Sequence, residues 1–135
     1  MSPGKLEVLT TEECLARLGQ AEVGRVGVCI GGIPEIFPVN FSLLDGAIVF
    51  RTGEGTKLHA ATRHHVLAFE VDDFDDEVRH GWSVLVIGPS DEITDPTEVS
   101  AARNLLSGTW VPAERYHVLR IDSERMSGRQ ISKRD

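Results

Sequence analysis

The sequence has few cysteines and no long apolar run. Cys14 and Cys29 are the two cysteines among 135 residues, and their spacing indicates neither a disulfide framework nor a zinc site. We expect both to be small buried side chains in a reducing compartment. No stretch approaches the ~20 apolar residues of a membrane-spanning helix, and the first ten residues hold no apolar run. The expectation is a soluble, cytoplasmic protein without a membrane partner.

Positive charge is also scarce. The formal net charge is −7 at pH 7, whereas nucleic-acid-binding proteins usually carry a basic surface. We therefore expect no nucleic-acid partner. A chain of this length matches one domain that can bury its own core. We expect a single domain over 1–135, with an N-terminal extension at 1–9 and a polar tail at 126–135.

Alternating apolar residues predict a meander of three strands. The segment 24–30 alternates, Gly31-Gly32 supplies a two-residue turn, and 37–43 alternates again. Asp45-Gly46 predicts a second tight turn, because both residue types tolerate positive φ, and it leads into a strand at 47–51.

Two prolines interrupt the second of these strands. Pro34 and Pro38 lack the amide hydrogen that strand pairing requires, so this strand should be bent, lie at an edge, or be open where a ligand approaches. Further strands are predicted at 65–71, 82–87 and 116–121, and the acidic stretch 72–77 is predicted to be a solvated loop.

Three short helices are also predicted. The stretch 9–14 contains a threonine cap followed three residues later by glutamate, which predicts a helix from about Thr11 to Leu18. Asp95-Pro96 begins another helix, to about Leu106, and a third is expected at 56–63. Six strands with short turns and peripheral helices favour a mostly β (α+β) fold, a closed or nearly closed antiparallel barrel, because closure removes exposed strand edges.

The segment 50–58 is a candidate phosphate site. It predicts a strand end, a glycine-containing turn and a helix start, where Arg51 and Lys57 supply charge and Thr52 and Thr56 supply hydroxyl groups. The alternative is that these residues only decorate the surface. The segment matches neither the phosphate loop of nucleotide hydrolases nor the dinucleotide fingerprint.

Other polar and aromatic residues have less distinctive settings. The strand 37–42 offers open backbone groups to a heteroaromatic ring, or is an ordinary amphipathic edge strand. Trp82 and Trp110 are candidates for core or interface packing. No spacing of the histidines builds a metal site on one element, so we expect no metal site and no metal ligand among His59, His64, His65, His80 and His117.

Seven segments, in their order along nearly the whole chain, resemble the pyridoxamine 5′-phosphate oxidase-like, flavin-binding split-barrel family. They are Gly24-Arg25-Val26-Gly27-Val28, Pro38-Val39-Asn40-Phe41, Phe50-Arg51-Thr52, Gly55-Thr56-Lys57-Leu58, Ala68-Phe69-Glu70-Val71-Asp72, Gly81-Trp82-Ser83-Val84 and Ser127-Gly128-Arg129. The resemblance implies a six-stranded antiparallel split barrel that pairs into a homodimer.

The resemblance also implies a cofactor site for flavin mononucleotide (FMN) or the deazaflavin F420. The flavin ring would lie along Pro38, Val39, Asn40 and Phe41, and its phosphate would be held by Arg51, Thr52, Thr56 and Lys57. Trp82 and Ser83 would close the ring pocket, and Trp110 and Arg129 would reach it across the dimer interface.

Two functions remain open at this point. One is an oxidoreductase in which the cofactor exchanges a hydride with a small-molecule substrate, and no residue is assigned as its acid or base. The other is a carrier or sensor of flavin, F420 or haem. Pyridoxamine phosphate oxidation itself is not expected, because the tail at 128–135 lacks the histidine that accompanies arginine in the substrate motif of the founding enzyme.

Overall fold

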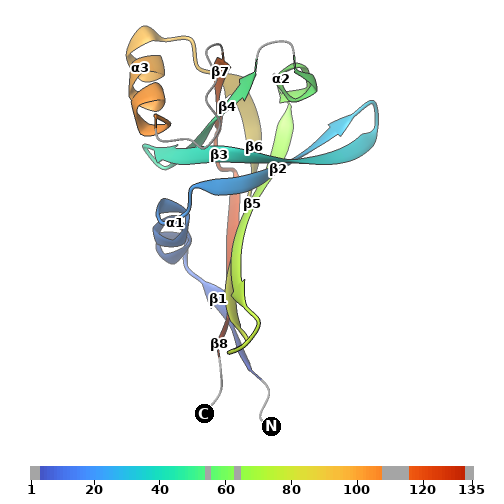
Figure 1. Cartoon of the computed structure of the whole chain (residues 1–135), viewed down its shortest axis with the longest axis vertical. Coiled ribbons are helices and arrows are strands. Elements are labelled where there is room, and N and C mark those ends of the chain that lie inside the picture. The colour runs from blue at the N-terminus through green and yellow to red at the C-terminus, as the bar shows by residue number, and fades with distance from the viewer. Residues whose placement is uncertain (1–3, 54–55, 63–64, 108–115, 133–135) are drawn as a thin grey trace.

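The computed structural model describes residues 4–53, 56–62, 65–107 and 116–132. These residues form eight strands and three helices (Figure 1). In chain order they are β1 (Lys5–Leu9), α1 (Thr11–Gly19), β2 (Val23–Ile30), β3 (Ile33–Leu44), β4 (Ala47–Gly53), α2 (Lys57–Thr62), β5 (Val66–Asp75), β6 (His80–Glu92), α3 (Pro96–Leu105), β7 (Tyr116–Ile121) and β8 (Arg125–Ser132). None of the helices described is long and apolar enough to cross a membrane.

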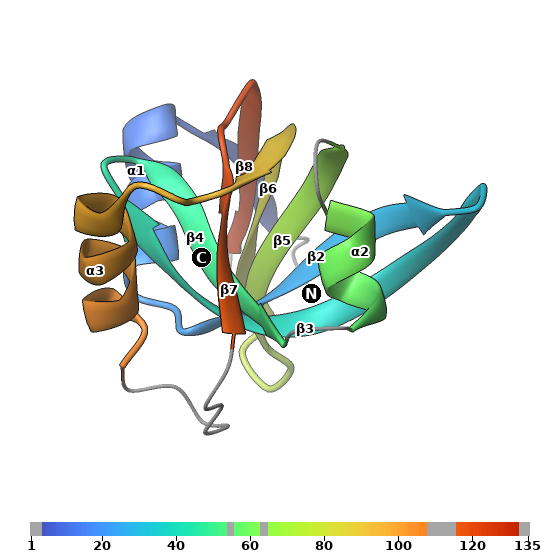
Figure 2. The same cartoon turned by 90° about the horizontal axis from the view of Figure 1, so that it is seen from above.

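Six of the strands close into a ring. The pairing runs β6-β5-β2-β3-β4-β7, and β7 pairs back onto β6, with all pairs antiparallel. The view in Figure 2 looks into this ring, with α3 on its outside and α2 at its end, where Leu58 joins the main core. The predicted mostly β, antiparallel barrel is therefore confirmed.

The remaining two strands extend the sheet below the ring. β8 pairs with the first half of β6, and β1 pairs with β8 (Figure 1). The prediction placed an extension at 1–9 and a polar tail at 126–135, but both segments contribute a strand. β1 is only five residues long and β8 has few apolar residues, so neither segment shows a clear strand pattern on its own.

Local turn and cap signals are confirmed. Gly31 and Gly32 have φ of 58° and 82°, and Asp45 and Gly46 have φ of 50° and 81°, as two-residue hairpin turns require. Thr10 caps α1: its hydroxyl accepts the Glu13 amide hydrogen, and its own amide donates to the Glu13 carboxylate. Asp95 caps α3 by accepting the Glu98 amide hydrogen.

β5 is longer than the sequence predicted, whereas the pairing of β3 agrees with the prediction. The acidic stretch predicted as a loop is largely strand, because β5 continues to Asp75 and pairs with β6. β3 behaves as its prolines indicate: residues 33–40 pair with β2, and no other described strand pairs along their second edge.

The main core lies inside the ring and continues under α1. Phe50, Phe69, Val26 and Leu119 are fully buried there. A smaller cluster, which includes Val49, Val118 and Ala102, packs α3 against the outside of β4 and β7. Neighbouring residues of β4 thus face opposite sides, and this alternation decides which candidate residues can meet.

Candidate functional site

The end of β4 separates two residues expected to bind one phosphate. Arg51 pairs with Val118 and Thr52 pairs with His117 in the β4–β7 register. Because successive strand residues point to opposite faces, Arg51 lies on the side of α3, whereas Thr52 lies on the barrel side with His117. The structure therefore divides the predicted cradle between two faces.

On the α3 side, two arginines converge on one aromatic ring. The guanidinium carbons of Arg51 and Arg103 lie 5.1 Å and 4.9 Å from the centre of the Tyr116 ring. Within the residues described, neither arginine forms an ion pair with a carboxylate. Two guanidinium groups held on a tyrosine offer planar, charge-assisted donors to a phosphate. Sequence reasoning missed Arg103 because it comes from α3, some 50 residues downstream.

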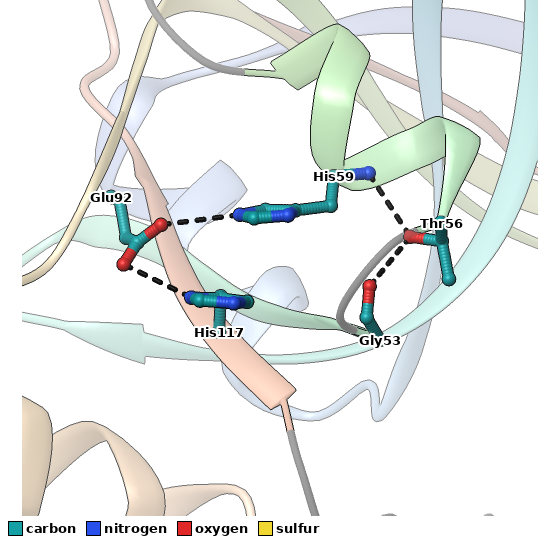
Figure 3. A network of polar contacts seen from close by, with 5 residues as sticks. All are labelled: Gly53, Thr56, His59, Glu92 and His117. Carbon is teal, nitrogen blue, oxygen red and sulfur yellow. Dashed lines mark hydrogen bonds and ion pairs between the residues drawn. The ribbon is translucent and has the colours of Figure 1, made fainter.

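The turn between β4 and α2 is closed by Thr56. Its hydroxyl donates to the Gly53 carbonyl over 2.7 Å and accepts the His59 amide hydrogen over 3.1 Å (Figure 3). The hydroxyl proton is thus engaged within the protein, and Thr56 shapes the helix start. Lys57 is the first residue of α2, but its side chain lies outside the described part of the structure.

β3, the strand expected to lie along a flavin ring, has one face in the core and one face directed outward. Val39 and Phe41 are buried in the core, and Phe41 packs edge-to-face on Phe69 with ring centres 4.8 Å apart. Pro38 and Asn40 alternate with them and face outward, exposed and half-buried respectively. A ring can therefore border Pro38, Asn40 and the unpaired backbone edge of β3.

The residues expected to close the ring pocket do not lie beside β3 or the arginine pair. Trp82 faces α1, where the Arg17 guanidinium lies 5.7 Å from its ring centre, and it lines an open depression of about 400 Å³. Ser83 is paired with Arg129 on the opposite, exposed face of the sheet. Trp110 falls in 108–115, outside the residues described.

Distance along β6 separates these residues from the phosphate side. Ser83 and Glu92 are both in β6, and nine residues of strand span about 30 Å. Glu92 contacts α2 and β7 at the upper end in Figure 1, whereas the β8 residues lie at the lower end. One chain alone does not bring Arg129 near Arg51.

The barrel side holds a cluster that sequence reasoning missed. His59 of α2 and His117 of β7 stack with ring centres 4.0 Å apart and planes inclined by 9°. Glu92 of β6 joins them: one carboxylate oxygen lies 3.2 Å from His59 Nε2 and the other lies 3.1 Å from His117 Nδ1 (Figure 3). Its members are 33 and 25 residues apart, so no local motif could reveal it.

The carboxylate of this cluster is stabilised in its charged form. Burial raises the pKa of Glu92, but the hydrogen bonds from His59 and His117 outweigh burial and hold the pKa below its ordinary value. The cluster thus consists of an ionised carboxylate that bridges the edges of two stacked imidazole rings, all three residues half-buried.

Comparison with known proteins gives the family. A family model for pyridoxamine 5′-phosphate oxidase matches residues 10–130. The uncharacterised protein Rv0080 of Mycobacterium tuberculosis is 34% identical over 128 residues, covering 91% of this chain and 84% of that protein.

Solved structures agree over nearly the whole chain. An FAD-binding protein of Mycobacterium smegmatis has a TM-score of 0.84 at 30% identity, covering 95% of this chain and 100% of that one. An FAD-binding protein of Mesorhizobium loti has a TM-score of 0.80 at 25% identity, covering 96% and 99%. Since the family model matches most of the chain and the fold agrees with these structures, the chain belongs to the pyridoxamine 5′-phosphate oxidase family.

Proposed function

We propose that this protein binds a flavin nucleotide and works as an oxidoreductase. The observation that carries the proposal is the convergence of Arg51 and Arg103 on Tyr116 at the end of β4, beside the start of α2. This donor set suits a phosphate anion, because guanidinium groups form paired, charge-assisted hydrogen bonds with it. Two similar proteins of known structure are FAD-binding proteins, which supports a flavin as the ligand.

The phosphate is the feature that the candidate cofactors share. The family resemblance implies FMN or F420, and the FAD-binding relatives add FAD. All three carry a phosphate group on the side chain of the ring system, so the arginines recognise each of them. A bound flavin or deazaflavin supplies the hydride chemistry, and the protein orients and shields it.

Each protein group has a defined part in this proposal. Arg51 and Arg103 hold the phosphate, and Lys57 at the first position of α2 adds charge. The Thr56 hydroxyl keeps the β4–α2 turn closed through Gly53 and the His59 amide. The outward face of β3, with Pro38 and Asn40, borders the ring.

The phosphate assignment is tested by titrating the purified protein with FMN, FAD and F420 and following fluorescence. We expect Arg51→Ala, Arg103→Ala and Lys57→Ala each to weaken binding of the preferred cofactor. Loss of one charge-assisted contact costs about 1.5 to 3 kcal/mol, or about 10- to 100-fold in Kd. Lys5→Ala, which changes an exposed cation on β1, is the control and should bind like the parent.

Unchanged affinity in all three variants would show that the phosphate lies elsewhere. Binding of none of the three cofactors by the parent protein would refute the function itself. Turnover of a nicotinamide reductant by the loaded protein supports the oxidoreductase, whereas a tight complex without turnover supports a carrier.

Pyridoxamine phosphate is not the substrate we propose. Its own phosphate needs a second set of paired cations near the ring. Among the arginines of the tail Arg129 is the best remaining candidate, and residues 128–135 contain no histidine to accompany it. The small-molecule substrate is therefore of another kind.

A further inference from the structure

We propose that His59, Glu92 and His117 form a binding site for a divalent transition-metal ion, with Zn²⁺ as its preferred occupant. The three side chains come from α2, β6 and β7 and meet at one end of the barrel (Figure 3). Their donor atoms all lie within 4.8 Å of one another. The site is distinct from the arginine pair, which lies on the other face of β4 and β7.

The donor types define the class of ion. Two imidazole nitrogens and one carboxylate oxygen suit Zn²⁺ and neighbouring transition metals, whereas Mg²⁺ and Ca²⁺ favour sites built from oxygen. The two hydrogen-bonded separations, 3.2 and 3.1 Å, are close to the roughly 3.3 Å between ligands of a tetrahedral zinc ion with bonds near 2.0 Å. The carboxylate charge also compensates part of the cation's charge.

Binding requires a small rearrangement of the rings. In the present arrangement the imidazoles stack nearly parallel, so they must splay for both lone pairs to point at one ion. His59 Nε2 and His117 Nδ1 become the ligands. A proton on a ligating nitrogen moves to the other nitrogen of the same ring, so the binding step needs no redox partner or leaving group.

A neighbouring hydroxyl fits the open position of such a site. Three protein ligands leave a fourth position for water, as in catalytic zinc sites. Thr52 pairs with His117 across β4 and β7 and is 3% exposed, and its Oγ1 has no hydrogen-bond partner among the residues described. A buried hydroxyl without a partner costs stability, and water on the metal would supply that partner.

Metal binding at this site should stabilise the local structure. An ion at this site ties α2 to the ends of β6 and β7, so it should stabilise the barrel wall next to the β4–α2 turn. Because the site does not depend on the flavin, failure of the flavin proposal would leave this one intact.

The test is isothermal titration of the full-length protein, dialysed against a chelator, with Zn²⁺. We expect saturable binding of one ion per chain and a rise in melting temperature. His59→Ala, His117→Ala and Glu92→Gln each remove a ligand and should weaken Zn²⁺ binding. The loss should exceed the ~10- to 100-fold that is typical when a residue hydrogen-bonded to a metal ligand is removed. His65→Ala changes an exposed histidine whose backbone carbonyl accepts the amide hydrogen of Ser90, two residues before Glu92 in β6, and it should bind normally.

A measurement on the unaltered protein covers the case in which the variants fail to fold. Carbethoxylation mapped by mass spectrometry should show that Zn²⁺ protects His59 and His117 but not His65. Absence of saturable Zn²⁺ binding by the parent protein, or equal protection of His65, would overturn the proposal.

Discussion

Gly88 marks the residue at which the barrel splits. β6 pairs with β8 up to Ile87 and with β7 from Ser90 onward. The connection from β7 to β8 crosses β6 between these points, and the amides of Asp122 and Glu124 donate to the carbonyls of Pro89 and Ile87. The crossing backbone lies so close that a Cβ on Gly88 would stand 1.6 Å from the Asp122 carbonyl oxygen.

Gly88→Ala should therefore be strongly destabilising. The atoms that a new methyl group meets are backbone, which cannot move aside without breaking the crossing, so we expect a loss of at least about 3 kcal/mol in the free energy of unfolding. Gly19→Ala is the matched control, because no atom lies within 4 Å of its added Cβ. At the end of α1 it should be neutral or stabilise by up to about 1 kcal/mol. Urea denaturation measures both, and equal stability of the two variants would contradict the role of Gly88.

Glu70 of β5, which pairs with β2, has a raised pKa. The Arg25 guanidinium lies 3.0 Å from a Glu70 carboxylate oxygen and 3.2 Å from one of Asp72. Burial, together with hydrogen bonding and repulsion from Asp72, raises the pKa of Glu70 to about 7, and the attraction of Arg25 offsets these causes only in part.

The raised pKa predicts that stability falls as pH rises. Between the ordinary value of 4.5 and about 7, the folded state binds more protons than the unfolded state, so the free energy of unfolding decreases with pH in this window. Glu70→Gln should remove this decrease. Melting temperatures from pH 5 to 8 measure it, with the exposed Glu124→Gln as control. A slope in Glu70→Gln equal to that of the parent would refute the assignment.

Elements set by neighbouring residues were predictable, whereas contacts between distant segments were not. The Gly31-Gly32 and Asp45-Gly46 turns and the Thr10 cap depend on one or two residues, so the sequence reveals them. The extent of β5 through Asp75 depends on its pairing with β6. The Arg51, Arg103 and Tyr116 group likewise requires three elements to pack together. The alternation of side chains along β4 was predictable. It places Arg51 and Thr52 on opposite faces of the sheet, so the prediction that both hold one phosphate conflicts with it.

At the scale of the whole molecule, the candidate site residues fall into two groups that one chain keeps apart. Arg51 lies near the end of β4 that leads to α2, whereas Ser83 and Arg129 lie on the strand extension formed by β6 and β8. Ser83 and Arg129 occupy the exposed face of that extension. The extension pairs the first half of β6 with β8, and β8 with β1.

The same face carries several exposed apolar side chains. In the register of β1, β8, β6 and β5, paired residues share a face, and this face includes Leu6, Val8, Phe74, Leu85 and Ile131. Val8 is 83% exposed and Leu6 is 59% exposed. α1 covers the opposite face, and no described element covers this one. Ser83 and Arg129 lie among these side chains, and a group of exposed apolar residues rimmed by polar ones is typical of a protein interface.

We therefore predict that the protein is a homodimer joined through this face, with Arg129 of one subunit placed near the cofactor of the other. Sedimentation at micromolar concentration should show a dimer. Val8→Glu should yield a folded monomer, because the side chain is almost fully exposed within one chain, whereas a buried charge at an interface costs several kcal/mol. Leu105→Glu changes an exposed apolar residue of α3 and should leave the dimer intact. If the site is shared, Val8→Glu should lose flavin affinity together with dimerisation. A parent protein that sediments as a monomer, or a Val8→Glu variant that remains dimeric, would rule out this interface.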